Sequence, residues 1–379
     1  MSRFKEQKCV MIIAGEASGD LHGSKLVMAM RKSSDSLFFC GIGGQALKNA
    51  GVRILADASE LAVVGITEAF SKMISLVKGM TVAKRLLKIL HPDLLILIDF
   101  PDFNLHIAAS AKKLGIPILY YISPQVWAWR SGRIKKIGNL VNHVAVILPF
   151  EEDLYLEHKI PVTFVGHPLL DIDHPPVDEI LKRSAENRSI IGLLPGSRDR
   201  EIARHLSVML DAAQDLIKRN NDLKFIISIA SSVKRKHVEA IVEGYRDTVN
   251  FELLSDNVDK VLEKCGFVIA ASGTVTLEAA IYGVPMVIIY KMSPISFLLG
   301  KAMAKVKNIG LVNLIEGKEI VPELLQGKAS PGNIANTVYE MLNDSSGLTR
   351  LRKDLFGIRG LLGDQGASER VAKIAMDMI

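Results

Sequence analysis

Residues 94–104 read LLILIDFPDFN, and this stretch decides the fold. Leu94–Ile98 is apolar at every position, which is typical of a parallel strand buried on both faces. The run stops at Asp99, and Asp102 follows shortly after. Ligands of open α/β sheets bind beyond the carboxyl ends of the strands, so we expect chemistry at these two carboxylates. The alternative is that they only form the turn and cap of a strand–helix junction.

A second expected strand, 116–122, also ends abruptly, in the sequence SPQVWAWR at 123–130. Both tryptophans of the chain, Trp127 and Trp129, lie in that loop.

Composition limits the class of protein. A chain of 379 residues is too long for one comfortable core, so we expect two α/β domains, and the prolines and acidic residues of 171–179 mark a linker. The net charge of +6 favours phosphate ligands, nucleic acid or an anionic membrane face. The basic residues are dispersed and no nucleic-acid-binding module is visible, so we expect no nucleic acid partner.

Localisation signals point to the cytoplasm. The three cysteines are scattered among apolar neighbours and form no zinc pattern, which suggests reduced, buried thiols and no metal. The apolar run 9–14 is too short for a signal peptide, and no stretch approaches the roughly 18 apolar residues of a membrane span.

The first strand, 10–14, leads into GEASGDLHG at 15–23, and a helix is expected from about 24 to 31. Glycines at such a turn let the backbone approach a ligand, and the following helix N-terminus favours negative charge. The predicted ligand-binding residues of this loop are Gly15, Glu16, Ser18, Gly19 and Asp20. The loop is not GxGxxG, which disfavours an NAD enzyme. His22 is either a catalytic or phosphate-contacting group or a structural histidine.

The second half of the chain repeats the architecture. After an expected strand at 190–194, Gly196, Ser197 and Arg198 precede a helix, and their backbone N–H groups, hydroxyl and guanidinium suit a diphosphate. The alternative is that Arg198 merely pairs with Glu201.

A further cradle is expected after the strand 267–270. Ser272, Gly273 and Thr274 precede a helix that offers its N-terminus to a phosphate, and Glu278 lies one turn later on the face of Thr274. A carboxylate there suits ribose hydroxyls.

Two amphipathic stripes, 66–77 and 295–306, face either the core or lipid, and lysines flank both of them. A basic cluster of Arg130, Arg133, Lys135 and Lys136 is either a solvated helix face or a phosphate contact.

Nine motifs together resemble the lipid-A-disaccharide synthases over nearly the whole chain. IDFPDFN at 98–104 and SPQVWAWR at 123–130 are the most specific. The others are GEASGD at 15–20, ELAVVGITE at 60–68, LPFE at 148–151, VGHPL at 165–169, LLPGSR at 193–198, SGTVTLE at 272–278 and NLIEGKEIVPELLQ at 313–326.

The resemblance implies a GT-B glycosyltransferase fold, an α/β architecture with two Rossmann-like domains facing a cleft. The domains implied are an acceptor-binding domain at 1–168, joined by a C-terminal helix at about 350–379 that crosses back, and a UDP-sugar-binding domain at 169–349.

The resemblance also implies the reaction. UDP-2,3-diacylglucosamine would donate its sugar to the 6-hydroxyl of 2,3-diacylglucosamine 1-phosphate, giving the β-1,6 disaccharide 1-phosphate and UDP in lipid A synthesis. An α-linked donor that becomes a β-linkage means inversion, which needs one general base and no covalent nucleophile.

The family pattern makes Asp99 the candidate base. It implies that Asp102 orients either this base or the acceptor. Arg198 and Asn313 match positions tied to activity, and Glu278 is the choice for ribose. Leu311 and Val312 replace the family's serine-leucine-proline lead into Asn313, which leaves the local backbone open. The resemblance implies no metal and no other cofactor.

Acylated substrates favour membrane contact by the 66–77 and 295–306 helices. The resemblance implies a cytoplasmic enzyme held peripherally on the inner membrane of a Gram-negative bacterium, and a homodimer is compatible with it. The rivals are a UDP-sugar 2-epimerase of the same fold, a non-catalytic UDP-sugar-binding protein and an NAD-dependent oxidoreductase.

Overall fold

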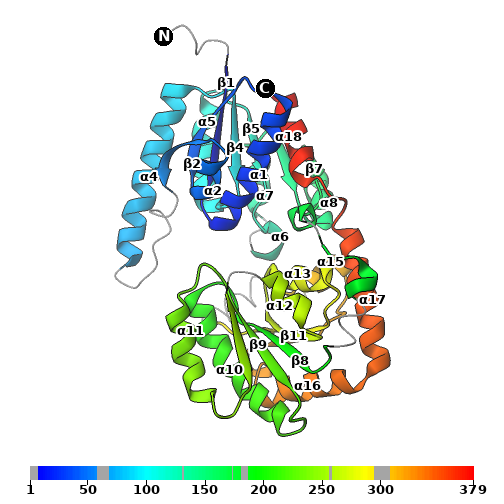
Figure 1. Ribbon diagram of the computed structural model, residues 1–379. Coiled ribbons are helices and arrows are strands. Elements are labelled where there is room, and N and C mark those ends of the chain that lie inside the picture. Colours follow the sequence, from blue (N-terminus) through cyan, green and yellow to red (C-terminus); the bar gives the residue numbers. More distant parts are fainter. Residues whose placement is uncertain are drawn as a thin grey trace. The chain divides into compact units, whose positions relative to one another are not determined.

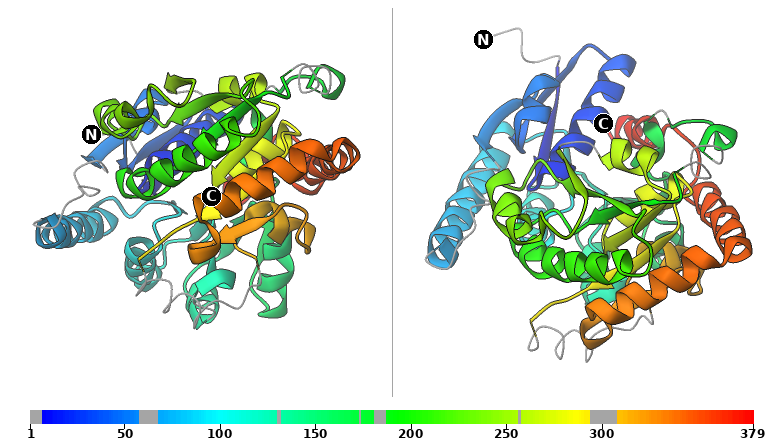
Figure 2. Two further views of the ribbon diagram at one scale, coloured as in Figure 1. Left: turned by 90° about the horizontal axis from the view of Figure 1, so that it is seen from below. Right: turned by 60° about the horizontal axis from the view of Figure 1, so that its bottom comes forward.

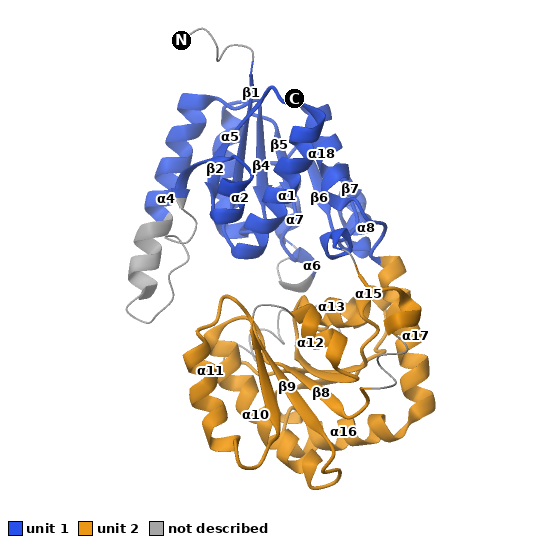
Figure 3. Ribbon diagram, in the orientation of Figure 1, with its two compact units in different colours: residues 1–172, 362–379 blue, residues 173–361 orange. Residues whose placement is uncertain are grey.

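The computed structural model describes residues 7–57, 68–129, 132–172, 174–180, 187–255, 258–293 and 308–379, with the side chains of 68–76 and 128–129 outside that description. The chain forms two compact units (Figure 3). Unit 1 contains residues 1–172 and 362–379, and unit 2 contains residues 173–361. Among the described helices, none is long and apolar enough to cross a membrane.

Unit 1 is built on a parallel sheet of seven strands in the order β3-β2-β1-β4-β5-β6-β7 (Figure 1). Its strands are β1 (Lys8–Ala14), β2 (Leu37–Gly43), β3 (Arg53–Asp57), β4 (Leu94–Ile98), β5 (Ile118–Tyr121), β6 (His143–Val146) and β7 (Val162–Phe164). Its helices are α1 (Ala17–Ser33), α2 (Gln45–Asn49), α4 (Glu68–Leu90), α5 (Pro101–Lys113), α6 (Val126–Trp129), α7 (Gly132–Gly138), α8 (Pro149–Glu157), the short η1 (Pro168–Asp171) and α18 (Ala367–Asp377).

Both faces of this sheet are covered, which explains why β4 is apolar at every position. Leu95 and Leu97 of β4 pack with α4, α5 and α7, whereas Leu94, Ile96 and Ile98 pack on the side of α1, α2 and α18. In Figure 1, α18 (red) lies beside α1 (blue), and the two helices pack together.

Asp171 holds the start of α18. Its carboxylate accepts hydrogen bonds from the backbone N–H groups of Gly366 and Ala367 at 2.8 and 3.0 Å, and from the Ser368 hydroxyl at 3.2 Å. The Arg370 guanidinium donates to the Val165 carbonyl at 2.8 Å. Two distant segments of the chain are thus joined in one unit.

Unit 2 contains a parallel sheet of six strands in the order β10-β9-β8-β11-β12-β13. The strands are β8 (Ile190–Leu194), β9 (Lys224–Ile229), β10 (Phe251–Ser255), β11 (Phe267–Ala271), β12 (Met286–Tyr290) and β13 (Glu323–Leu325). The helices are α10 (Asp199–Ile217), α11 (Arg235–Val242), η2 (Glu243–Tyr245), α12 (Val258–Lys264), α13 (Val275–Ile281), α15 (Leu311–Glu316), η3 (Gln326–Lys328), α16 (Pro331–Asn343) and α17 (Ser345–Leu361).

One face of this sheet packs against α10, α11 and α16, whose buried residues join Ile191, Leu193 and Phe225 in a single core. In Figure 2, α10 (green) and α16 (orange) lie side by side. The other face is covered by α12 and α13. The predicted fold class, two α/β domains each with a parallel sheet, is confirmed.

The five strands predicted at 10–14, 94–98, 116–122, 190–194 and 267–270 are present as β1, β4, β5, β8 and β11. The main correction concerns α1, which begins at Ala17 instead of near residue 24. Ser18, Gly19 and Asp20 therefore belong to its first turns. A Cβ on Gly23 would approach the Ile98 side chain at 3.0 Å, so the glycine serves close packing of helix on sheet, not a loop.

Candidate functional site

Each sheet has one point where the strand order reverses. In unit 1 it lies between β1 and β4, and in unit 2 between β8 and β11. Neighbouring loops leave the sheet in opposite directions there, which opens a crevice at the carboxyl ends of the strands. The loop after β1 therefore lies next to Asp99, and the loop after β8 lies next to Ser272–Thr274. The predicted residues of the loops after β1, β4, β8 and β11 therefore lie at these two points, whereas Asn313 lies on α15.

The turn after β4 has an uncommon backbone. Asp99 and Phe100 have φ values of 45° and 49°, a left-handed conformation that L-residues with side chains seldom adopt. The Asn104 side-chain amide donates to the Asp99 carbonyl at 2.6 Å and to the Ile98 carbonyl at 3.2 Å. The Tyr120 hydroxyl donates to the same Asp99 carbonyl at 2.9 Å. Asp99 itself is half-buried.

The same turn reaches the first loop. The Phe100 ring covers Gly15 so closely that a Cβ there would lie 2.2 Å from the ring. Only glycine fits at this position, which explains the first residue of the GEASGD motif by packing. Glu16 and Ser18 are exposed at the start of α1.

Asp20 is buried and has partners within the protein. Its carboxylate accepts hydrogen bonds from the backbone N–H groups of Gly44 at 2.6 Å, Ala46 at 2.8 Å and Leu47 at 3.2 Å. These groups belong to the first turn of α2, so Asp20 anchors that helix. A contact of Asp20 with substrate stays a prediction.

Asp102 lies on the first turn of α5, and its side chain is 79% exposed. It forms an ion pair with Arg133 of α7, a member of the predicted basic cluster. Lys135 and Lys136 are exposed on the same helix, and Arg130 lies outside the described residues.

The loop after β5 is held by a buried carboxylate. The Trp127 indole N–H donates to Glu151 at 3.1 Å, and the Trp127 ring makes an edge contact with Phe150. Burial raises the pKa of Glu151 to about 7. The sequence marks Glu151 only through its place in the LPFE motif, because its burial depends on the tertiary fold.

In unit 2, the loop after β8 presents Gly196, Ser197 and Arg198 at the start of α10. Gly196 has a φ of 119°, and a Cβ there would meet the Glu201 carboxylate at 2.6 Å. Glu201 accepts hydrogen bonds from the Ser197 N–H at 3.2 Å and from the Arg198 guanidinium at 3.1 Å. The predicted pairing of Arg198 with Glu201 is therefore present, on an arginine whose side chain is 67% exposed.

His205, one of the residues that sequence reasoning missed, supports this loop from below. It is fully buried on α10, and its Nδ1 lies 3.0 Å from the Pro195 carbonyl. The Lys291 N–H donates to its Nε2 at 3.0 Å, so the ring is neutral with the proton on Nδ1. Burial lowers its pKa, in agreement with the neutral form.

The second cradle follows β11. The Ser272 hydroxyl donates to the Ile309 carbonyl at 3.1 Å, whereas the space around Gly273 is open and Thr274 is exposed. Glu278 lies on α13, and burial, followed by the charge of Asp259, raises its pKa to about 7. Within the described residues its carboxylate accepts no hydrogen bond, and its contact with ribose stays a prediction.

Asn313 is completely buried at the start of α15. Its amide nitrogen donates to the Val321 carbonyl and to Glu323 Oε1, each at 2.8 Å. Its oxygen accepts from the N–H groups of Ile320 at 2.8 Å and Val321 at 3.0 Å. All its hydrogen-bonding groups are used within unit 2, so its predicted link to activity is best explained by positioning of this segment.

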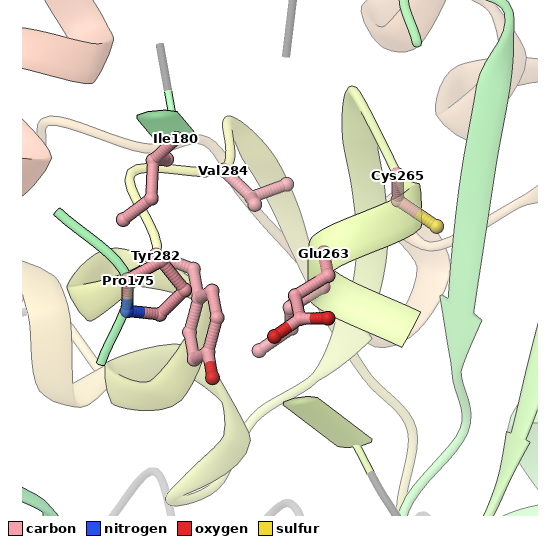
Figure 4. Close-up of a pocket in the computed structure, with 7 residues that line it drawn as sticks. Pro175, Ile180, Glu263, Cys265, Tyr282 and Val284 are labelled. Atoms are coloured by element: carbon pink, nitrogen blue, oxygen red, sulfur yellow. The ribbon is translucent and has the colours of Figure 1, made fainter. Parts of the chain in front are cut away.

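Two other features lie apart from the predicted residues. A small, open pocket in unit 2 is lined by Pro175, Ile180, Leu262, Glu263, Cys265, Tyr282 and Val284, and none of these is a predicted site residue (Figure 4). Within the described part of the chain, no group of three potential metal ligands lies together.

Comparison with known families gives one match over most of the chain. Residues 10–374 match the family model described as lipid-A-disaccharide synthetase. A lipid-A-disaccharide synthase of Geobacter sulfurreducens is 43% identical over 374 residues, covering 98% of this chain and 97% of the relative. The corresponding protein of Syntrophus aciditrophicus is 44% identical over 376 residues, with 98% of each chain covered.

Solved structures show a likeness of fold alone. A UDP-GlcNAc 2-epimerase from Neisseria meningitidis bound to UDP-GlcNAc has a TM-score of 0.67 at 11% identity, covering 97% of this chain and 100% of that one. MurG of Acinetobacter baumannii has a TM-score of 0.61 at 15% identity, covering 98% and 99%.

Proposed function

Because the chain belongs to the lipid-A-disaccharide synthetase family, we propose that Asp99 is the general base of its glycosyl transfer. The activity follows from the family: the chain is a glycosyltransferase of lipid A biosynthesis that acts on a UDP-sugar and a lipid acceptor. The epimerase alternative is supported by fold alone.

The proposed reaction transfers 2,3-diacylglucosamine from UDP-2,3-diacylglucosamine to 2,3-diacylglucosamine 1-phosphate. Asp99 accepts the proton of the acceptor 6-hydroxyl while that oxygen attacks the anomeric carbon. The bond from the anomeric carbon to UDP breaks with inversion, and UDP leaves with the electron pair. One base is sufficient for such a displacement.

The observation that carries the assignment of Asp99 is its backbone. A half-buried carboxylate at the switch point of the sheet is held in a left-handed turn by Asn104 and Tyr120. Strained turns of this kind persist where the surroundings fix them, and they cluster at active sites, ligand clamps and switch regions. Asp102, which pairs with Arg133, would orient the acceptor and not take the proton.

Unit 2 would hold the nucleotide, and unit 1 the acceptor. Arg198 and the Ser197 N–H would bind the diphosphate and stabilise the charge that develops on departing UDP. Ser272, Gly273 and Thr274 would line the neighbouring phosphate path, and Glu278 would accept the ribose hydroxyls. The helix start and the guanidinium supply the positive field that UDP requires, without a metal.

We further propose that the exposed face of α4 meets an anionic membrane surface, where the acylated substrates reside. Val77, Val82 and Ile89 are 57%, 38% and 63% exposed, and the exposed Lys78, Arg85 and Lys88 lie among them. Apolar and basic residues on one helix suit a lipid interface. Of the predicted stripe 66–77, only Val77 has a described side chain, and the stripe 295–306 lies outside the described residues.

Cosedimentation with vesicles of anionic phospholipid tests this face of α4. Replacing Val77 and Ile89 by Asn should release the protein from vesicles. The same change at Leu156, which is 55% exposed on α8, is the matched control and should not. Equal release in both variants would refute the assignment to α4.

The test of Asp99 compares turnover with nucleotide binding. Asp99→Asn should abolish release of UDP from the two lipid substrates, because the amide cannot accept the proton, while the Kd for UDP changes by less than about twofold. Release of UDP by the native chain without acceptor would favour the epimerase. Retained turnover in Asp99→Asn would exclude Asp99 as the base.

A further inference from the structure

Two residues from different elements hold the peptide carbonyl of Asp99, and we propose that Tyr120 is a positioning residue for this base. The inference rests on the proposed role of Asp99. It concerns a group that does not touch substrate and acts only through the turn 98–100.

The geometry brings two donors to one acceptor. The Asp99 carbonyl receives the Tyr120 hydroxyl at 2.9 Å and the Asn104 amide at 2.6 Å. The orientation of the Asn104 amide is fixed, because its nitrogen faces a second carbonyl, that of Ile98. Its oxygen is buried with no hydrogen-bond partner among the described residues, a cost that the two donated bonds must offset.

The turn would relax without these bonds. Asp99 and Phe100 both have a left-handed backbone, a conformation that is unfavourable for residues with side chains. The Tyr120 ring is fully buried in β5, between α5 and the neighbouring strands, so its hydroxyl is a rigid donor. Without this donor the peptide group between Asp99 and Phe100 can rotate. The rotation displaces the Asp99 carboxylate.

The electrostatics agree with this arrangement. Burial, together with the nearby charge of Asp99, raises the pKa of Tyr120 well above its usual range, so the phenol stays protonated and remains a donor throughout the working range of the enzyme.

The neighbouring residue provides a matched control. Tyr121 is buried to the same extent on the same strand, yet its side chain belongs to the core on the other face of the sheet. Its hydroxyl has no hydrogen-bond partner among the described residues. Tyr121→Phe therefore removes a buried hydroxyl without touching the Asp99 turn.

Tyr120→Phe should lower kcat about tenfold, as expected when a reacting group is displaced slightly, and leave KM for both substrates within about twofold. Tyr121→Phe should leave kcat within about twofold. Fluorescence of the two tryptophans, both in the 123–130 loop, reports whether unit 1 is folded, and the Kd for UDP reports on unit 2. Asn104→Ala removes the other donor. It should likewise lower kcat and leave KM for both substrates nearly unchanged.

The outcomes are distinguishable. If Asp99→Asn is inactive while Tyr120→Phe and Asn104→Ala keep normal kcat, Asp99 remains the base and the positioning role is overturned. If Tyr120→Phe and Tyr121→Phe lose kcat equally, or if KM rises with the loss, the effect is structural and the inference also fails. If Asp99→Asn is active, the proposed function fails and the inference fails with it.

Discussion

The Arg198 guanidinium donates to the Glu201 carboxylate at 3.1 Å, within the loop where a diphosphate is expected. The same carboxylate accepts the Ser197 N–H, so it occupies two donors that the nucleotide would use. If UDP binds as proposed, it competes with Glu201 for both donors.

Glu201→Gln should therefore strengthen UDP binding, by about threefold, the size expected for an exposed ion pair. Calorimetric titration with UDP measures the change. Glu239→Gln is the control, because Glu239 pairs with Arg235 at 2.8 Å on the exposed surface of the same unit. Weaker binding in Glu201→Gln would mean that Glu201 holds Arg198 in its productive position.

The affinity for UDP should depend on pH through Glu278. Its pKa is raised to about 7, and the ionised carboxylate is the better acceptor for ribose hydroxyls. The Kd for UDP should fall between pH 6 and 8 as Glu278 loses its proton. In Glu278→Gln this pH dependence of the Kd should disappear. If it persists in the variant, another titrating group is responsible for it.

Asn313→Ala should destabilise unit 2 by about 2–4 kcal/mol, since it leaves buried partners of four hydrogen bonds unsatisfied. Urea unfolding measures this loss. Asn333, which is exposed on α16 and donates to the Lys328 carbonyl, provides the control Asn333→Ala, with an expected change below about 1 kcal/mol. A native stability of Asn313→Ala with lost activity would instead point to direct contact with substrate.

The half-buried His22 and the buried His167 should make unit 1 sensitive to acid. Burial lowers the pKa of His22 to about 4 and that of His167 to about 3, from an ordinary value near 6.5. Both are neutral in the folded state. Their contribution to the free energy of unfolding is therefore complete above pH 6.5 and is lost as the pH falls towards 4 for His22 and 3 for His167. At pH 5 each costs about 2 kcal/mol, because only the unfolded chain takes up the proton.

Comparison of variants isolates this effect. Glu151, with its pKa raised to about 7, acts in the opposite direction, since its contribution is lost as the pH rises from 4.5 through 7. The stability difference between the native chain and His22→Gln should therefore shrink by about 2 kcal/mol between pH 7 and 5. A stability difference that stays the same at pH 7 and pH 5 would refute the assignment to His22.

The sequence predicted those parts of the fold that depend on local pattern. The all-apolar run Leu94–Ile98 gave β4 and Asp99 at its end, and β8 lies at the predicted residues 190–194. The start of α1 was wrong, because Gly19 and Gly23 look like loop residues in sequence, although in the structure they allow the helix to approach Ile98.

The supporting shell of the site could not be predicted. Tyr120 and Asp99 are 21 positions apart, and their contact depends on the pairing of β4 with β5. The same holds for His205, whose contact with Lys291 spans 86 positions. Local pattern identifies residues that end strands, whereas the groups that fix their geometry come from neighbouring elements.

The return of α18 to unit 1 sets an order for folding during synthesis. Residues 362–379 leave the ribosome only after every residue of unit 2. In the folded chain, however, they pack in the same core cluster as Leu26 and Val27 of α1, on one face of the unit 1 sheet. Until α18 is synthesised, this apolar face is uncovered and the Asp171 carboxylate lacks its hydrogen bonds to the start of α18. Unit 2 can therefore complete its core first. The core of unit 1 stays incomplete until α18 packs, and the apolar surface exposed in the meantime is of the kind that chaperones bind.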